Sequence, residues 1–518
     1  MYFGEQSLYF DCRLTYDHLP FLRVLVNSKI ILFSWVFKVK VFLPSCDDII
    51  RIYALFEKRI LICMNRFLKA RPGFYRELFV LVIPIVIQNV IASAISFADT
   101  LMLGNVDQTS LSASGLAGQL MFLINVMFFG LNSAITILAS QYWGKKDMNV
   151  ISKILGMGLI IAMVVTVSFS ACAFFVPKRV MWIWTNDPKL IEAGAVYLRY
   201  VAPSYIFLGI FQPYMSILKS CERVVFSTVT STFALVVNVV FNYLLIFGVG
   251  PFPEMGIAGA ALATSFSCGS GALISIIDFM TQKRMPRSLK IMFRIPLALV
   301  GDFFRYSLPA FINDVMWGLA FTVNSIIMGH LGSDIVAANA VVSSVRDLIT
   351  VVGFGISAAA SIMLGKEIGE NRLDEAKKDA SSVLRVTIFS GLISGLVLFA
   401  ISPFIPNTVD ITAVAAGYLR IMLYINIAYQ MGQIINTVLI ASIFRCGGNS
   451  TFGMFLDIIC MWCFAVPLGL ISAFVLKLPP LIVYVLMCTD EFAKMPFAIH
   501  HYLKGGWIRN ITRNNVGT

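Results

Sequence analysis

Asp99, a single carboxylate, interrupts a long uncharged stretch of the sequence. About twenty residues without Asp, Glu, Lys or Arg precede it, from Leu78 through "IASAISFA". An acid at the centre of a bilayer costs roughly 2.5 to 3.5 kcal/mol on insertion scales. Such an acid needs partners, and the chemistry that it can perform in an apolar helix is the uptake of a proton or the binding of a cation.

Three polar residues further along the chain are candidate partners of Asp99. Asn238 and Asn242 lie four residues apart and therefore share a helix face. Thr264 lies within the small-residue segment "GIAGAALATS". With Asp99 they predict either a carboxylate that takes up one proton or a cage of oxygen atoms for Na⁺. The competing explanations are structural: loop amides that bind a helix-end acid, hydrogen bonds between helices, and close packing at Thr264.

A second set of polar residues predicts the wall of a substrate cavity. One tryptophan and several amides follow single faces of apolar segments, and two acids interrupt such segments. An aromatic ring beside a carboxylate attracts an organic cation through its π face and its charge. Hydrogen bonding between helices explains any one of these residues equally well. The predicted cavity residues are Gln88, Asn313, Asp314, Trp317, Asn324, Asn426, Gln430, Gln433 and Asp457.

Two further patterns have a structural interpretation. Glu491 and Lys494 are three residues apart, as in an ion pair on one helix face, and Asp490 precedes them. Cys460 and Cys463 match C-x-x-C inside an apolar segment, without nearby Cys or His to complete a metal site. We therefore expect neither a metal nor a cofactor.

The composition places these residues in a membrane. Of the 518 residues, 58% are hydrophobic and only 13% are charged, and the mean hydropathy is +0.82. Soluble domains are about a quarter charged. Apolar segments close to the roughly 20 residues that cross a bilayer recur along the chain. They predict an all-α polytopic membrane protein with twelve transmembrane helices, at 78–103, 113–139, 152–176, 194–217, 225–249, 256–280, 303–329, 335–363, 381–403, 413–441, 451–475 and 479–502.

The charged residues indicate how these helices are oriented. Lys and Arg outnumber Asp and Glu by 40 to 28, and they gather in alternate loops. Basic loops stay on the cytoplasmic side of a membrane. Their distribution predicts that both termini and the basic linker 281–302 are cytoplasmic. A basic face interleaved with aromatic residues is missing, so nucleic acid is not an expected partner.

Over their first portions, the two halves of the sequence repeat at a constant shift in residue number. Pro84 matches Pro309, and Gly144 matches Gly369. We call this difference in residue number, which takes Pro84 to Pro309, the repeat shift. With six spans each, the halves enter the membrane in the same direction, which predicts two six-helix bundles around a pseudo-twofold axis along the membrane normal, the usual architecture of alternating-access transporters. We expect the bundles at 64–280 and 303–503, a tail at 504–518, and a dispensable extension at 1–63.

The repeat also indicates that the two halves differ in chemistry. Asp99 corresponds to Asn324, so that only the first half has an acid at this place. Asp99 is the one acid that the sequence places inside the first bundle. We therefore expect ion coupling to depend on the first half.

The segments that carry the likeness to a known family are "PIVIQNVIASAISFADTLMLG", "ASQYWGKKD", "YLRYVAPS", "NVVFNYLLIFG", "GIAGAALATSFS" and "CGGNSTFGMFLD". In this order and spacing, over about residues 70 to 510, the chain resembles the bacterial branch of the multidrug and toxin extrusion (MATE) family. The resemblance implies a secondary antiporter of the bacterial plasma membrane that exports cationic amphiphilic compounds in exchange for H⁺ or Na⁺. It also implies a role for Asp99 in ion coupling. Its partners would be small organic cations and the lipid bilayer, and we expect a monomer.

One departure from the family leaves the coupling ion open. In members with a well-described ion site in the first bundle, the fifth span reads Asn-x-x-x-Asp, whereas here Asn238 is followed by Asn242. An asparagine coordinates a cation but takes up no proton. Two other functions remain: a flippase of lipid-linked glycans, although the candidate cavity residues are neutral or acidic rather than basic, and an exporter of a specific metabolite. The sequence motifs of an embedded enzyme are missing.

Overall fold

The computed structural model of the chain describes residues 70–104, 107–282, 286, 288–407, 409 and 411–513. The chain divides into two units, residues 1–69 and 70–518. The predicted extension at 1–63 lies outside the described residues, and so do the basic side chains of Lys283, Arg284 and Arg287 in the predicted linker. The helices and sites that follow all belong to the second unit.

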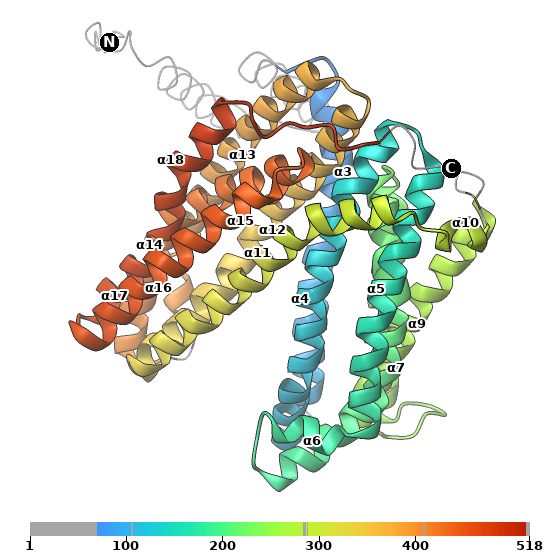
Figure 1. Cartoon of the computed structure of the whole chain (residues 1–518). Helices are drawn as coiled ribbons and strands as arrows, with labels where there is room; N and C mark the ends of the chain where they lie inside the picture. The colour runs from blue at the N-terminus through green and yellow to red at the C-terminus, as the bar shows by residue number, and fades with distance from the viewer. Residues whose placement is uncertain are drawn as a thin grey trace, which may run out of the picture. The chain divides into compact units, whose positions relative to one another are not determined.

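Six long helices make up the first half of this unit (Figure 1, blue to green). They are α3 (Phe74–Gly104), α4 (Gln108–Gly144), α5 (Met148–Phe175), α7 (Pro188–Ser220), α8 (Val224–Phe247) and α9 (Gly256–Thr281). A short helix, α6 (Pro177–Trp182), joins α5 to α7, and another, α10 (Leu289–Phe293), lies in the linker.

The second half (Figure 1, yellow to red) repeats this arrangement with more interruptions. Its long helices are α11 (Leu297–His330), α12 (Ser333–Gly369), α13 (Leu373–Ile401) and α14 (Ala413–Thr437). α14 continues as a π-helix, Val438–Phe444, and the next span is built of α15 (Ser450–Ile458), Ile459–Ala465, α16 (Val466–Leu470) and Ile471–Val475. A short 3₁₀ turn, Ile405–Asn407, precedes α14, and α17 (Pro480–Met487) and α18 (Asp490–Leu503) end the half.

Side-chain caps determine where several helices begin. Asp107 accepts the backbone N–H of Ser110 at 2.7 Å, and Asp147 accepts that of Val150 at 3.2 Å. Each carboxylate satisfies a backbone donor that the first turn leaves free, and its charge interacts favourably with the positive end of the helix. At the other end of α8, Gly248 takes a φ of 65°, the left-handed conformation that ends a helix with little strain in glycine.

The predicted all-α fold, with twelve spans in two six-helix bundles, is confirmed. Eleven helical stretches of the described residues are long and apolar enough to cross a membrane. The twelfth predicted span, 479–502, is divided into α17 and α18 at Cys488 and Thr489. Several helices extend beyond the predicted spans, as α12 does by continuing to Gly369, because hydropathy marks only the apolar part of a helix.

Contacts between the two halves obey the predicted symmetry. α4 packs against α11 and α12, and α3 packs against α12. A methyl group added to Gly144 would lie 2.0 Å from the carbonyl oxygen of Lys366, and one added to Gly369 would lie 1.9 Å from that of Gln141. Under the repeat shift, Gly144 corresponds to Gly369 and Gln141 corresponds to Lys366. The two glycine contacts are therefore one contact repeated by the pseudo-twofold axis.

A second pair of contacts repeats in the same way. A methyl group on Gly130 would lie 2.9 Å from the Cα atom of Phe311, and one on Gly355 would lie 2.5 Å from a side-chain carbon of Val86. Under the repeat shift, Gly130 corresponds to Gly355 and Val86 corresponds to Phe311. The repeat that the sequence predicts is thus present at the interface of the halves, and glycine is what allows the helices to approach.

The last described residues, 504–513, bind the end of α4. The buried side chain of Gln141 donates to the carbonyl oxygens of Cys446 at 2.7 Å and Arg509 at 3.2 Å, and accepts the N–H of Ile511 at 2.9 Å. Arg513 forms two hydrogen bonds of 2.6 and 2.7 Å with Asp302 of α11. One glutamine of the first half therefore holds backbone from two separate segments of the second.

Candidate functional site

The structure brings together the four residues that the sequence predicts for ion coupling. Asp99 lies near the end of α3, Asn238 and Asn242 lie on α8, and Thr264 lies on α9. Asn242 Nδ2 donates to Asp99 Oδ1 at 2.6 Å and to Asn238 Oδ1 at 3.1 Å. Asn238 Nδ2 lies 3.5 Å from Thr264 Oγ1. The four side chains form a continuous polar chain across three helices.

Two amide groups of this cluster have hydrogen-bonding capacity to spare. Asn242 is buried, and its Oδ1 has no hydrogen-bond partner among the described residues. The amide of Asn238 fits its neighbours better when it is turned over, with its nitrogen 3.0 Å from Asp99 Oδ2. With the nitrogen toward Asp99 the amide donates to a carboxylate, and with the oxygen toward Asp99 it accepts from a protonated carboxyl. The site therefore accommodates both charge states of Asp99.

The charge of Asp99 has no counterion in the part of the chain that the structure describes, where no Lys or Arg forms an ion pair with it. Its surroundings add one aromatic hydroxyl that the sequence did not indicate as part of the site. Tyr197 of α7 interacts with Thr264 and lies within electrostatic reach of Asp99. The only signal for Tyr197 in the sequence is that Tyr197-Leu198-Arg199 recurs at 418–420.

The prediction that Asp99 is the one acid inside the first bundle is wrong. α9 also carries Asp278, which is buried near the end of that helix. Asp278 is already compensated, because the two terminal nitrogens of the Arg223 guanidinium donate to it at 2.8 Å and the hydroxyl of Tyr214 donates at 2.6 Å. Asp278 therefore joins α9 to α7 and to the start of α8, whereas the side chains that hydrogen-bond to Asp99 among the described residues are amides.

The predicted cavity residues of the second half lie in separate hydrogen-bonded groups. Asn426 donates to the Tyr484 hydroxyl at 2.6 Å, and Gln430 donates to Thr350 at 2.7 Å, so that both connect α14 to neighbouring helices. Gln433 is buried on the same helix. Gln88, Asn324 and Gln433 each have a buried side-chain oxygen without a partner among the described residues.

Two predicted cavity acids are paired with basic residues. Asp314 binds Arg445 at 2.6 and 3.2 Å, and Arg445 also donates to Ser133 of α4 at 3.0 Å. Asp457 binds Lys494 at 3.1 Å and accepts from Asn313 at 3.0 Å. Trp317 packs on Phe321 with ring centroids 4.3 Å apart. The sequence indicated the expected Glu491–Lys494 pair, which is present at 3.0 Å, but neither of these pairings between helices.

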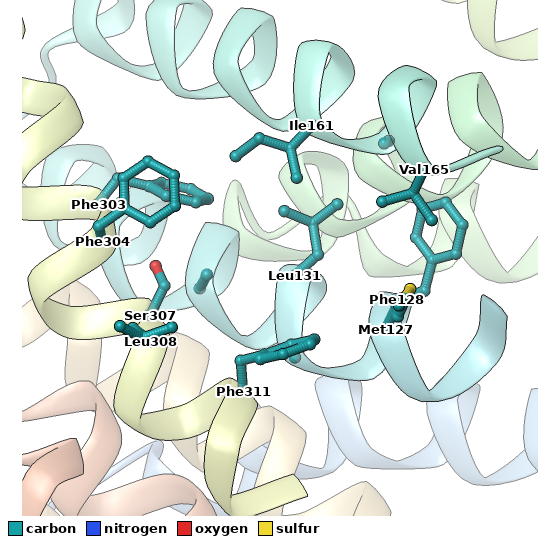
Figure 2. Close-up of a pocket in the computed structure, with 13 residues that line it drawn as sticks. Met127, Phe128, Leu131, Ile161, Val165, Phe303, Phe304, Ser307, Leu308 and Phe311 are labelled. Atoms are coloured by element: carbon teal, nitrogen blue, oxygen red, sulfur yellow. The ribbon is translucent and has the colours of Figure 1, made fainter. Parts of the chain in front are cut away.

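A cavity of about 230 Å³ lies between the halves, where side chains from α4, α5 and α11 converge (Figure 2). Its lining is almost wholly apolar and includes Phe128, Phe303, Phe304 and Phe311, with Ser307 as the polar exception. The nine predicted cavity residues do not line this cavity. Their role in binding a substrate stays a prediction.

Comparison with known proteins places this geometry among membrane transporters. A profile of the MatE family matches residues 84–244 and 309–471, and the first residues of the two matches are related by the repeat shift. The uncharacterized transporter YisQ of Bacillus subtilis (strain 168) is 24% identical over 449 residues, which cover 84% of this chain and 95% of YisQ. The probable multidrug resistance protein NorM of Rhizobium meliloti (strain 1021) is 25% identical over 422 residues, covering 77% and 88% of the two chains. The Vibrio cholerae MATE transporter VcmN, in its bent form, shares the fold with a TM-score of 0.75 and 15% identity, over 84% of this chain and 99% of VcmN.

Proposed function

Because this chain belongs to the MatE family of multidrug and toxin extrusion transporters, we propose that it exports organic cations in exchange for protons and that Asp99 carries the proton. The observation on which the proposal depends is the setting of Asp99, whose described partners are amides and not cations. An acid without a counterion in an apolar helix is more easily neutralised by a proton than one that is paired with Arg or Lys.

The neighbours of Asp99 fit a cycle between two charge states. Neutral Asp99 donates its O–H to the Asn238 oxygen, and ionised Asp99 accepts from Asn242 and from the turned amide of Asn238. Each state is hydrogen-bonded, so the site can gain or lose a proton without leaving a buried carboxyl oxygen unsatisfied. The symmetrical glycine contacts between α4 and α12 supply the surface along which the halves separate and rejoin.

Several features favour an organic cation as the substrate. The aromatic cavity between the halves fits the apolar part of an amphiphile, and an unpaired carboxylate in the adjoining bundle favours positive charge. The relative from Rhizobium meliloti carries the name of a multidrug resistance protein. A basic surface for pyrophosphate, which a flippase of lipid-linked glycans would need, is missing from the lining of the cavity. We place the protein in the bacterial inner membrane with both termini in the cytoplasm.

Sodium is the competing coupling ion, and a specific observation favours it. The free oxygen of Asn242, together with the oxygens of Asn238, Thr264 and Asp99, provides hard oxygen ligands of the kind that alkali cations take. A single carboxylate supplies little charge for a tight sodium site, and this favours the proton.

Ethidium transport in proteoliposomes tests the proposal with imposed H⁺ or Na⁺ gradients. The native protein should accumulate ethidium under a pH gradient at fixed Na⁺. Asp99→Asn should lose this accumulation but keep exchange of labelled for unlabelled ethidium. Asp107→Asn is the matched control, because Asp107 is an exposed helix cap and asparagine caps equally well.

Equal gradient-driven accumulation by native protein and Asp99→Asn would remove Asp99 from coupling. Accumulation that follows Na⁺ at fixed pH would replace the proton by sodium. The absence of ethidium exchange in the native protein would contradict the assignment of organic cations as substrates.

A further inference from the structure

Four charged side chains are buried together in the second half. They are Asp457 of α15 and Asp490, Glu491 and Lys494 of α18, and no side chain among them is more than 10% exposed. The Nζ atom of Lys494 lies 3.1 Å from Asp457, 3.4 Å from Asp490 and 3.0 Å from Glu491. We call these four residues the Lys494 cluster.

The division of the twelfth span positions this cluster. α17 ends at Met487 and α18 begins at Asp490, so Asp490 and Glu491 occupy the first turn of a helix within the bundle. Gly432 of α14 allows this turn to approach, because a methyl group there would lie 3.3 Å from the Cβ atom of Glu491. A continuous helix would not present two acids and a helix N-terminus at this depth.

The charges of the Lys494 cluster do not balance. Three carboxylates face one ammonium group, so full ionisation would leave two negative charges uncompensated in a buried site. Neighbouring carboxylates around one centre cannot all remain ionised where water is excluded, and such groups bind a proton instead. Arg445 offers no compensating charge, because it is already paired with Asp314.

Two amide side chains beside the cluster support a bound proton independently. Asn313 donates to Asp457 at 3.0 Å, and Asn436 donates to Glu491 at 2.7 Å. Both asparagines are at least nine-tenths buried, and each has an Oδ1 atom without a hydrogen-bond partner in the described part of the chain. An amide that turns its oxygen toward a protonated carboxyl accepts the O–H, which gives an unpartnered oxygen a donor.

Among the described residues, the groups that interact directly with the cluster are neutral. Tyr429 of α14 lies within electrostatic reach of Lys494, and Cys460 of the π-helical segment Ile459–Ala465 lies near Lys494 and Asp457. A tyrosine and a thiol are neutral at physiological pH. Arg346 of α12 lies within electrostatic reach of Tyr429 and Cys488, but it forms no ion pair with the three acids, and its guanidinium lies 5.2 Å from the ring centroid of Phe321. Lys494 is therefore the one cation that is ion-paired with these acids among the described residues.

We propose that the Lys494 cluster is a second proton-binding site of this protein, in which one proton is shared among Asp457, Asp490 and Glu491. Binding does not depend on Asp99, whereas a role in coupled export rests on the function proposed above. α11 connects the cluster to the interface of the halves, because Asn313 binds Asp457 and the next residue, Asp314, binds Arg445, which contacts Ser133 of α4. A change in the charge of the cluster can thus reach the contact that opens during transport.

Proton counting on the full-length protein in lipid nanodiscs tests this proposal. Infrared difference spectroscopy detects the C=O stretch of protonated carboxyl groups, and titration counts the protons released by an alkaline pH jump. Asp99→Asn removes the first-half contribution and leaves the cluster intact. In this background we expect Glu491→Gln to remove a carboxyl band and to lower the count by one proton, while Asp374→Asn, at a 93% exposed side chain, changes neither.

Several results would overturn the proposal. One is a folded Glu491→Gln variant whose band and count match those of its parent. If Glu491→Gln does not fold, Asp457→Asn takes its place, and an Asp99→Asn protein without any protonated-carboxyl band is decisive by itself. A band that Na⁺ abolishes at fixed pH, with sodium binding lost in Glu491→Gln, would assign the site to sodium. Ethidium transport by Asp99→Asn bears only on the proposed function, so either proposal can fail alone.

Discussion

Replacement of Gly369 by alanine should shift the protein away from the state described here. The added methyl group would lie 1.9 Å from the carbonyl oxygen of Gln141, whereas ordinary contact begins at 3.4 Å. The obstacle is helix backbone and not a flexible side chain, so α4 and α12 must move apart to accommodate it. Overpacking of this kind costs about 1–3 kcal/mol. If the halves exist in two states, this cost should favour the separated state by roughly 5- to 150-fold.

A distance measurement between the halves tests this expectation. Asn149 and Asp374 are exposed, lie in the first turns of α5 and α13, which follow α4 and α12, and are equivalent under the repeat shift. Spin labels on genetically encoded ketone side chains at both positions avoid the ten native cysteines. Double electron–electron resonance should show a longer distance between the two spin labels in Gly369→Ala than in the native protein.

The control variant is Gly118→Ala, on α4, where an added methyl group meets nothing within 4 Å. Alanine in place of glycine should there improve helix propensity by up to about 1 kcal/mol and leave the distance unchanged. Gly144→Ala, the symmetry-related substitution, should act as Gly369→Ala does. Identical distance distributions in Gly369→Ala and Gly118→Ala would show that the glycine contact does not set the equilibrium between states.

Three other outcomes follow from particular contacts. The Asn242→Asp variant should bind one more monovalent cation than the native protein, either H⁺ or Na⁺. A second carboxylate in place of the Asn242 amide, 2.6 Å from Asp99, cannot remain ionised beside Asp99 unless a cation is bound. Proton release and binding of radioactive sodium count the cations, and an unchanged count would contradict this. Gln141→Leu should lower the free energy of unfolding by about 3 kcal/mol in thermal melts, since it leaves three backbone partners unsatisfied at roughly 1 kcal/mol each. Hydrogen bonds from Ser110 lower the pKa of Asp107, so its capping stabilises the protein above the unfolded pKa of about 4 and is lost as pH falls through the folded value. Asp107→Ala should therefore cost about 1 kcal/mol at pH 7, and the difference from native protein in denaturant titrations should become smaller in acid, where the neutral carboxyl keeps only a hydrogen-bond acceptor.

The association of Asp99 with Asn238 and Asn242 was predictable because each leaves a signal in the sequence. A charge in an uncharged helix needs partners, and amides four residues apart share a face. The pairing of Asp314 with Arg445 was not predictable, because spacing along one chain gives no distance between helices. For the same reason the spacing of Glu491 and Lys494 indicated one ion pair but not that Asp457 joins it from α15.

The division of the twelfth span also lay beyond the sequence pattern. Residues 480–487 are uniformly apolar, and the break that follows contains neither Gly nor Pro; Thr489 stands there, followed by Asp490 and Glu491. What distinguishes the break is tertiary: the first turn of α18 delivers two acids to Lys494, and the free N–H groups of a helix start favour carboxylates. These interactions form only when α14 and α15 are in place.

Symmetry and asymmetry serve different requirements in this molecule. Two halves that separate and rejoin need equivalent surfaces, and the paired contacts of Gly144 with Lys366 and of Gly369 with Gln141 meet that need. Coupling needs a group whose charge changes, and duplication of that group is not required. Asp99 accordingly corresponds to Asn324 in the second half, where the acids of the Lys494 cluster lie on other helices. On the proposed mechanism, a transporter built on a repeat preserves the contacts along which its halves move, while the two halves diverge in the chemistry that drives the motion.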